Sequence, residues 1–169
     1  MKNLYLLRHA HTEGYSLSIP DYQRKLTDIG IKDVSSLGHI LKTEKVNIDL
    51  IISSSAIRAR KTASILAQQL DYDATAILQE KSLYQCTEDI LLKYINELQN
   101  QDAQDVLLVN HNPTISSFVR VLTGIDYGFM SPCSLAKISF PTLHWGDVSK
   151  GLGKLAYFRH AQQGFITMI

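Results

Sequence analysis

Residues 4–13 read LYLLRHAHTE, a short apolar run that ends in an arginine and a histidine. The four apolar side chains from Leu4 to Leu7 suit a strand that is covered on both faces of a sheet. Arg8 and His9 then fall where such a strand gives way to a loop. In parallel α/β sheets, ligands bind at the carboxyl ends of the strands. The opening stretch therefore predicts the type of fold and the edge of the sheet at which a site should lie.

Apolar runs alternate with segments of helical period along the first 125 residues. We expect strands at residues 4–7, 48–52, 75–78 and 105–109. Apolar side chains at helical spacing predict helices within residues 31–41 (behind an N-cap at Thr27), 59–70, 91–98 and 115–122. After Gly124 we expect two additional edge strands, at residues 135–140 and 154–158. This alternation predicts a three-layer α/β/α fold with a mostly parallel central sheet.

The composition is that of an ordinary globular protein. Its 17 basic and 16 acidic side chains give no electrostatic reason to expect nucleic acid or an anionic membrane as a partner. No apolar run approaches the roughly 18 to 20 residues of a membrane helix, and Arg8 interrupts the first run before it reaches signal-peptide length. Cys86 and Cys133 are too few for a secreted disulfide framework. We expect a single domain over residues 1–169, located in the cytoplasm.

The expected strand ends bear side chains that suit an anion. Arg8 and His9 follow the first strand, Arg58 lies shortly after the second, and His111 follows the fourth. Because these ends meet at one edge of the sheet, we expect two imidazoles and two guanidinium groups to converge there, with little carboxylate nearby. Guanidinium groups pair with phosphate oxygens, and an imidazole among them can attack phosphorus and become transiently phosphorylated. The sequence predicts a phosphate site with a histidine nucleophile and no cofactor.

The residues after His111 add to this prediction. Asn112 suits the N-cap of the following helix, with Pro113 at the first helical position. His111 would then lie beside the positive end of that helix, which attracts anions.

Each of these residues taken alone also has an interpretation without catalysis. An Arg-His pair after a strand is usually part of a solvated loop, and a histidine before Asn-Pro is usually a turn residue. His11, two positions after His9, could form a metal site with it, but no carboxylate at useful spacing accompanies the pair, so we expect no metal. The prediction of a phosphate site therefore rests on the four residues together.

Three segments resemble motifs of the histidine phosphatase superfamily, also called phosphoglycerate mutase-like. The opening LYLLRHAHTE resembles the Arg-His-Gly/Ala signature of that superfamily. Residues 51–66 (IISSSAIRARKTASIL) resemble its second-arginine segment, and residues 107–119 (LLVNHNPTISSFV) resemble its second-histidine segment. Residues 24–27 and Gly30 also resemble the stretch before its first helix. The resemblance extends over about residues 1 to 125.

The resemblance implies a role for each of the four residues. His9 would accept the phosphoryl group, Arg8 and Arg58 would bind its oxygens, and His111 would complete the pocket. The same four residues follow from the strand-end argument above.

Two positions near the expected site differ in how well they fit the motifs. Arg60 could compete with Arg58, but the pattern Ser-x-x-Arg-Ala-x-x-Thr-Ala aligns Arg58. Asn110 stands where the superfamily usually has glycine before its second histidine. Because asparagine tolerates left-handed backbone angles better than most residues, we expect the turn to be retained.

The general acid is less well defined. Many members of the superfamily place a glutamate in a long segment after the third strand, whereas residues 78–90 (LQEKSLYQCTEDI) form a short one here. Glu80 is the nearest candidate for a general acid, followed by Glu88 and Glu13. The short segment resembles the small bacterial phosphohistidine phosphatases, which act on phosphorylated histidine of protein partners. An imidazole leaving group can already be protonated at its other nitrogen, so it needs less help than an alcohol.

The sequence is compatible with three functions. The leading prediction is a phosphatase that acts on phosphohistidine of a protein partner and releases inorganic phosphate. A phosphatase for small phosphate esters is the alternative, and it is favoured if Glu80 points into the pocket. A non-catalytic phosphate-binding or scaffold module is the third, although the presence of both histidines and both arginines argues against it. A mutase is disfavoured because the chain offers no evident lid.

Overall fold

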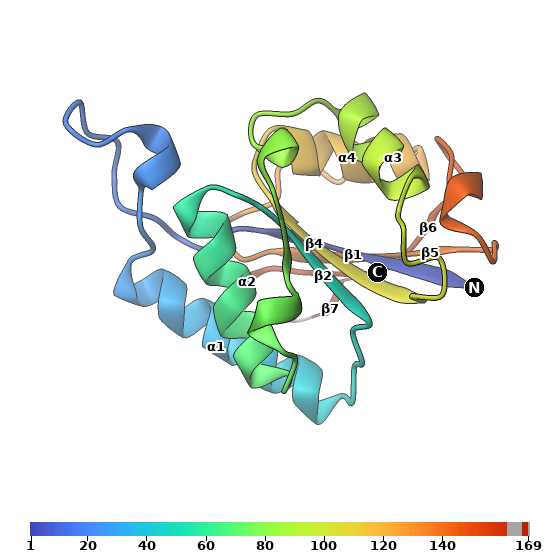
Figure 1. The fold of residues 1–169 in the computed structure, drawn as a ribbon, viewed down its shortest axis with the longest axis horizontal. Coiled ribbons are helices and arrows are strands. Elements are labelled where there is room, and N and C mark those ends of the chain that lie inside the picture. Colours follow the sequence, from blue (N-terminus) through green and yellow to red (C-terminus); the bar gives the residue numbers. More distant parts are fainter. Residues whose placement is uncertain (162–166, 169) are drawn as a thin grey trace.

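A seven-stranded sheet forms the centre of the computed structural model, which describes residues 1–161 and 167–168 (Figure 1). The strands are β1 (Lys2–Arg8), β2 (Leu50–Ser54), β3 (Leu78–Glu80), β4 (Asp105–Asn110), β5 (Leu135–Phe140), β6 (Lys154–Arg159) and β7 (Thr167–Met168). Their order in the sheet is β3-β2-β4-β1-β5-β6-β7. Strands β1 to β4 and β6 run in one direction, and β5 and β7 run in the other. The sheet is mixed and mostly parallel, as the sequence predicts.

The main helices lie on both faces of this sheet. They are α1 (Asp28–Thr43), α2 (Ile57–Gln69), α3 (Glu88–Asn96) and α4 (Thr114–Thr123). Helices α1 and α2 cover one face, and α3 and α4 cover the other (Figure 1). Successive side chains of a strand point to opposite faces. Leu4 and Leu6 of β1 accordingly join the core on the α3/α4 side, whereas Tyr5 and Leu7 join the core on the α1/α2 side. The three-layer α/β/α prediction is confirmed.

The third strand begins later than the sequence predicts. The predicted strand at residues 75–78 is largely replaced by a short 3-10 helix, Ala74–Ala76, and β3 starts only at Leu78. The cause is Asp73, whose carboxylate accepts hydrogen bonds from the main-chain N–H of Thr75 (2.9 Å) and from its hydroxyl (2.7 Å). Such a side-chain cap closes a turn and competes with extended backbone.

The two C-terminal strands predicted from the sequence are present, but neither lies at an edge. Strand β5 pairs with β1 on one side and with β6 on the other, and β7 pairs with β6. With only two residues, β7 is too short to leave a recognisable pattern in the sequence. Within residues 1–161 and 167–168, no helix has both the length and the apolar character that a bilayer crossing requires.

The two helix starts next to the expected site differ in how well the sequence predicts them. Thr27 caps α1 as predicted, since its hydroxyl oxygen accepts a hydrogen bond from the N–H of Gly30 (3.2 Å). The predicted cap of α4 is wrong. Pro113 occupies the N-cap position, and the helix begins at Thr114. The side-chain amide of Asn112 instead donates to the carbonyl oxygen of Met130 (2.9 Å), which holds a distant loop against the start of α4.

Helix α1 also fixes the loop that follows β1. The carbonyl oxygen of His11 accepts a hydrogen bond from the N–H of Thr27 (3.1 Å). A Cβ atom added at Gly30 would lie 2.3 Å from that same oxygen. The helix can therefore approach the loop this closely only because residue 30 has no side chain.

We expect Gly30→Ala to destabilise the protein. Displacing packed backbone costs about 1–3 kcal/mol, of which the higher helix propensity of alanine recovers up to about 1 kcal/mol. Gly14→Ala is the matched control, because no atom beyond residue 14 and its two chain neighbours lies within 4 Å of a Cβ at that position. Urea unfolding should show a loss of about 1–2 kcal/mol for Gly30→Ala alone. Equal stability of the two variants would show that the contact is not tight.

Candidate active site

The structure brings the four predicted residues together at one cavity of about 720 Å³. His9 follows β1, His111 follows β4, and Arg58 lies in the first turn of α2, just after β2. Parallel pairing sets Arg8 opposite Asn110, and the N–H of His9 donates to the carbonyl oxygen of Asn110 (3.0 Å). The ring centroids of the two histidines consequently lie 5.0 Å apart.

His9 is buried in a neutral form with a defined tautomer. Its Nδ1 lies 2.9 Å from the carbonyl oxygen of Ala10, and its Nε2 accepts a hydrogen bond from Nε of Arg58 (3.3 Å). Because a carbonyl oxygen can only accept, Nδ1 bears the hydrogen and Nε2 bears the lone pair. Burial, together with the proximity of His111 and Arg58, holds the pKa of His9 well below its ordinary value. The result is an uncharged imidazole whose lone pair faces a guanidinium group.

His111 is held from the opposite side of the cavity. Its Nε2 lies 2.8 Å from the hydroxyl oxygen of Ser54, and its main-chain N–H donates to the side chain of Asn110 (2.8 Å). Burial lowers the pKa of His111 to about 3, and the nearby Arg58 acts in the same direction. Its Nδ1 is buried and has no hydrogen-bond partner among the described residues. A buried polar atom without a partner is unusual in a folded protein and suits a site that binds a polar group.

The two rival arginines occupy different environments. Arg58 is 5% exposed and lines the cavity, whereas Arg60 is exposed and does not line it. Arg8 is partly buried, and its Nη1 donates to the carbonyl oxygen of Met130 (2.7 Å). The Nε of Arg8 is buried without a partner in the described part of the chain. The cavity thus contains the arginine that the motif alignment selected.

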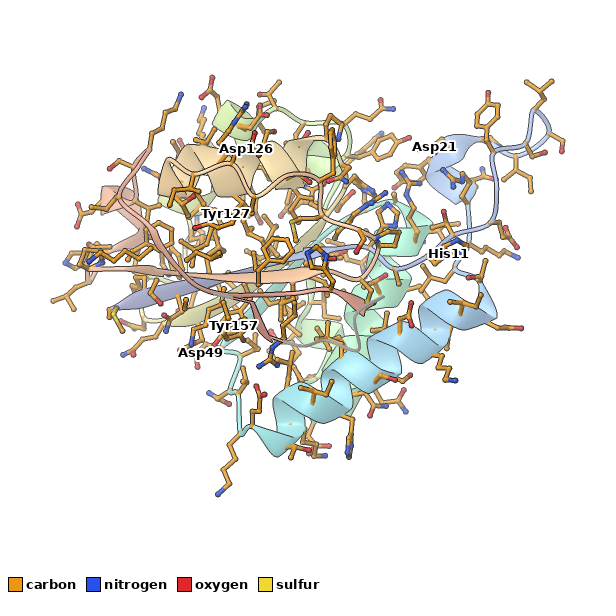
Figure 2. All side chains as sticks on the ribbon, turned by 180° about the vertical axis from the view of Figure 1, so that it is seen from behind. His11, Asp21, Asp49, Asp126, Tyr127 and Tyr157 are labelled. Carbon is orange, nitrogen blue, oxygen red and sulfur yellow. The ribbon has the colours of Figure 1, made fainter. Side chains whose placement is uncertain are left out.

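The expectation of little carboxylate near these cations is wrong. Asp21, from the 3-10 helix η1 (Asp21–Gln23), lines the cavity and lies on the projecting segment between β1 and α1 (Figure 2). Its carboxylate accepts hydrogen bonds from Arg58 (2.8 Å), Arg24 (3.0 Å) and Tyr84 (2.9 Å). Burial alone would raise the pKa of Asp21, but the three donors outweigh burial and hold it at about 2. Asp21 is therefore ionised at neutral pH.

The sequence contained only an indirect signal for Asp21. The residue lies three positions before Arg24, which opens the short stretch that resembles the superfamily. No apolar period or turn signal indicates that this loop folds back over the start of α2, so its contact with Arg58 is a property of the tertiary structure.

None of the three carboxylates proposed as general acids lines the cavity. Glu80 accepts a hydrogen bond from the hydroxyl of Tyr94 (3.0 Å) and borders a separate hollow with that residue. Glu88 accepts a hydrogen bond from Ser117, and Glu13 is exposed. The structure does not bring Glu80 to the predicted site, because β3 ends with this side chain directed toward α3.

Asn110 does not use the left-handed backbone expected of it. It is the last residue of β4, and it is absent from the described residues with positive φ. Its side-chain oxygen accepts from the N–H of His111 (2.8 Å), and its amide nitrogen lies 3.6 Å from Sγ of Cys86. The turn is kept by side-chain hydrogen bonding rather than by backbone freedom.

His11 lies at the cavity but is turned toward α1. Its Nδ1 lies 2.9 Å from the hydroxyl oxygen of Thr27. In the described ranges, no group of three or more His, Cys, Asp or Glu residues is placed to hold a metal ion. Cys133 is buried, which raises the pKa of its thiol far above the ordinary value and makes it a poor nucleophile.

The neutral state of His111 predicts how stability depends on pH. The unfolded chain binds a proton at this side chain below about pH 6.5, but the folded protein does so only near pH 3. The free energy of unfolding should therefore fall as the pH falls through this range, by about 1 kcal/mol from pH 6 to pH 5 for this residue. Urea unfolding of the wild type and of His111→Asn should show a shallower decrease in the variant. Identical slopes would mean that His111 is not buried as a neutral ring.

The chain is similar in sequence to a known protein family. The family model of the histidine phosphatase superfamily (branch 1) matches residues 4–89, just over half of the 169 residues. An uncharacterized protein of Mycobacterium tuberculosis is 29% identical over 161 residues, which cover 90% of this chain and 98% of that protein. An uncharacterized protein of Mycobacterium leprae is 31% identical over 121 residues, which cover 70% of this chain and 71% of that protein.

Solved structures show the same fold at lower identity. The protein histidine phosphatase SixA complexed with tungstate matches with a TM-score of 0.81 and 20% identity, over 95% of this chain and 98% of that one. A phosphoserine phosphatase of Entamoeba histolytica in complex with 3-phosphoglyceric acid matches with a TM-score of 0.67 and 17% identity, over 94% and 96% of the two chains. Because the family model matches just over half of its residues, this chain belongs to branch 1 of the histidine phosphatase superfamily.

Proposed function

We propose that this chain is a phosphatase that transfers the phosphoryl group of its substrate to His9 and then to water, and that its substrate is phosphohistidine in a protein partner. The observation that carries the proposal is the convergence of Arg8, His9, Arg58 and His111 on one cavity, with the lone pair of His9 facing Arg58 at 3.3 Å. Inorganic phosphate is the second product.

His9 has the protonation state that a nucleophile requires. In the first step, the lone pair on its Nε2 forms a bond to phosphorus while the bond between phosphorus and the leaving group breaks, and that electron pair leaves with the leaving group. In the second step, a water oxygen bonds to phosphorus, the bond from phosphorus to His9 breaks, and a water proton is released to solvent or phosphate. The hydrogen bond from Nδ1 to Ala10 keeps the ring oriented through both steps.

Arg8, Arg58 and His111 supply donors to the oxygens of the transferred group. The buried nitrogen atoms without partners, Nε of Arg8 and Nδ1 of His111, both belong to residues that line the cavity. A phosphoryl oxygen is a strong acceptor, and a guanidinium group can engage it without changing its own charge. Charge that develops on the phosphoryl oxygens in the transition state is therefore met by donors already in place.

The absence of a well-placed acid supports phosphohistidine as the substrate. Asp21 is the carboxylate that lines the cavity in the described chain, and its pKa of about 2 leaves it without a proton to give. An alcohol leaving group needs a proton as its bond to phosphorus breaks, whereas the imidazole of phosphohistidine can leave as a neutral ring. The likeness of the fold to SixA is consistent with this proposal.

The cytoplasmic location and the single domain over residues 1–169 stay predictions of the sequence.

The test of the substrate class is a comparison of turnover on two kinds of substrate. We expect a higher kcat/KM on a protein that carries phosphohistidine than on alkyl phosphate esters, with activated aryl phosphates in between. A general acid typically contributes about 10²- to 10⁴-fold, and alkyl esters should be poorer substrates by a factor of that order. Rapid hydrolysis of an alkyl ester with no activity on phosphohistidine would favour the small-molecule phosphatase instead.

We expect His9→Ala to abolish turnover without unfolding the protein, because the variant removes the attacking lone pair from a loop rather than from the core. Labelled substrate should leave acid-labile phosphate on His9 of the wild type, as mass spectrometry of a rapid quench would detect. Label on Ser53, Ser54 or Cys86 would reject the mechanism, as would turnover by the variant at the rate of the wild type.

We expect Arg58→Ala to weaken the binding of inorganic phosphate and to slow turnover about ten- to a hundredfold, the value of a lost charged hydrogen bond. Arg60→Ala is the matched control two residues away, since that side chain is exposed and outside the cavity lining. Calorimetric phosphate binding and steady-state kinetics on both variants provide the comparison. A larger effect of Arg60→Ala would overturn the assignment.

A further inference from the structure

Asp21 and Arg58 form an ion pair in the lining of the cavity. Both terminal nitrogens of Arg58 donate to Asp21, Nη1 to its carbonyl oxygen (2.5 Å) and Nη2 to its carboxylate (2.8 Å). The third nitrogen, Nε, faces Nε2 of His9 (3.3 Å). The side chain of Arg58 is 6% exposed and that of Asp21 is 36% exposed. The carboxylate therefore forms the outer, solvent-facing member of the pair.

Other side chains keep this carboxylate in place. Arg24 donates to one carboxylate oxygen of Asp21 (3.0 Å), and Tyr84 donates to the other (2.9 Å). Arg24 is itself anchored, since its Nη2 donates to the hydroxyl of Thr12 (2.6 Å) and to the carbonyl oxygen of Glu13 (2.7 Å). A carboxylate with donors on both oxygens cannot turn away from the cavity without losing charged hydrogen bonds.

The net charge of the cavity lining matches that of one dianion. Its lining includes three guanidinium groups, those of Arg8, Arg24 and Arg58, and one carboxylate among the described residues, that of Asp21. At pH 8, where histidine side chains are neutral, three positive charges and one negative charge leave a formal charge of +2. A phosphoryl group with a charge close to −2 balances them. A further negative charge on the leaving group would have no cation of its own and would be repelled by the carboxylate of Asp21.

We propose that Asp21 selects substrates by the charge of the leaving group, favouring groups that bear a positive charge or an N–H donor over groups that bear a negative charge. This inference rests on the proposed phosphatase function and adds a specificity residue to it. The imidazole of phosphohistidine meets the requirement, because its second nitrogen can donate a charge-assisted hydrogen bond to the carboxylate. A phosphate ester with a carboxylate near its phosphate is repelled.

The proposal can be tested on aryl phosphates whose para substituent is cationic, neutral or anionic, with the change between variants as the readout that is independent of the leaving-group pKa. We would measure kcat/KM at pH 8 and low salt for esters with a trimethylammonium, a neutral or a carboxylate substituent. The wild type should prefer them in that order. Asp21→Asn keeps the shape of the side chain and removes its charge, so the ratio of kcat/KM for the cationic ester to that for the anionic ester should fall about tenfold.

Asp71→Asn is the matched control. Asp71 forms an ion pair with Lys42 (2.7 Å) just beyond the end of α2 farthest from Arg58, and it does not line the cavity. The ratio should be unchanged in this variant. If Asp21→Asn lowered kcat/KM equally for all three esters, the residue would only position Arg58, and selection by charge would be refuted.

The wild type alone keeps the proposal testable if circular dichroism shows that Asp21→Asn does not fold. Each kcat/KM would then be divided by the rate of uncatalysed hydrolysis of the same ester, and an equal ratio for the anionic and the cationic ester would overturn this inference and leave the phosphatase function standing. Hydrolysis of none of the three esters, and none of phosphohistidine, would overturn the proposed function and this inference with it.

Discussion

The register between β1 and β4 is the constraint on which the site depends. Arg8 lies opposite Asn110, and the next peptide continues the pairing, because the N–H of His9 donates to the carbonyl oxygen of Asn110. Residues that directly follow two parallel neighbours must then lie side by side, which sets the imidazoles of His9 and His111 5.0 Å apart. A shift by one residue would exchange the faces of either strand and separate the rings. The apolar side chains of β1 oppose such a shift, since Leu4 and Leu6 belong to one core and Tyr5 and Leu7 to the other.

Placing polar groups at the end of a buried strand has an energetic cost, and the site meets it in two ways. The imidazoles remain neutral, so burial costs them only the hydrogen bonds that they would form with water. Contacts of His9 with Ala10 and of His111 with Ser54 replace part of these hydrogen bonds. Arg58 cannot become neutral, and its charge is balanced by the carboxylate of Asp21. The difference explains why a carboxylate is found beside this guanidinium group, and the loop bearing Asp21 thereby stabilises the charged site.

The sequence predicted the parts of the molecule that follow from local pattern. Apolar runs and helical spacing located the strands and helices, and strand-end logic located the four cavity residues, because both depend on neighbours in the chain. The failures have a common cause in long-range or side-chain contacts. Asp73 caps a turn where a strand was expected, Asn112 binds the carbonyl oxygen of Met130 rather than capping α4, and Asp21 reaches Arg58 across 37 positions of sequence. The spacing of apolar residues along the sequence does not predict such contacts.

The residues that local pattern predicts are those of the proposed chemistry, whereas the residue proposed to determine selectivity is held by tertiary contacts. The proposed nucleophile and the proposed phosphate donors lie at the ends of β1, β2 and β4, where the sheet fixes their distances and leaves little freedom to vary them. Asp21, Arg24 and Tyr84 lie in connecting segments, whose length and course are not constrained by strand pairing. On the proposed role of Asp21, a change in this loop alone would alter the charge that meets the leaving group, while strand pairing would keep His9 and His111 at the same distance. Strand pairing therefore fixes the histidines, and loop contacts alone hold the carboxylate for which we propose a role in selectivity.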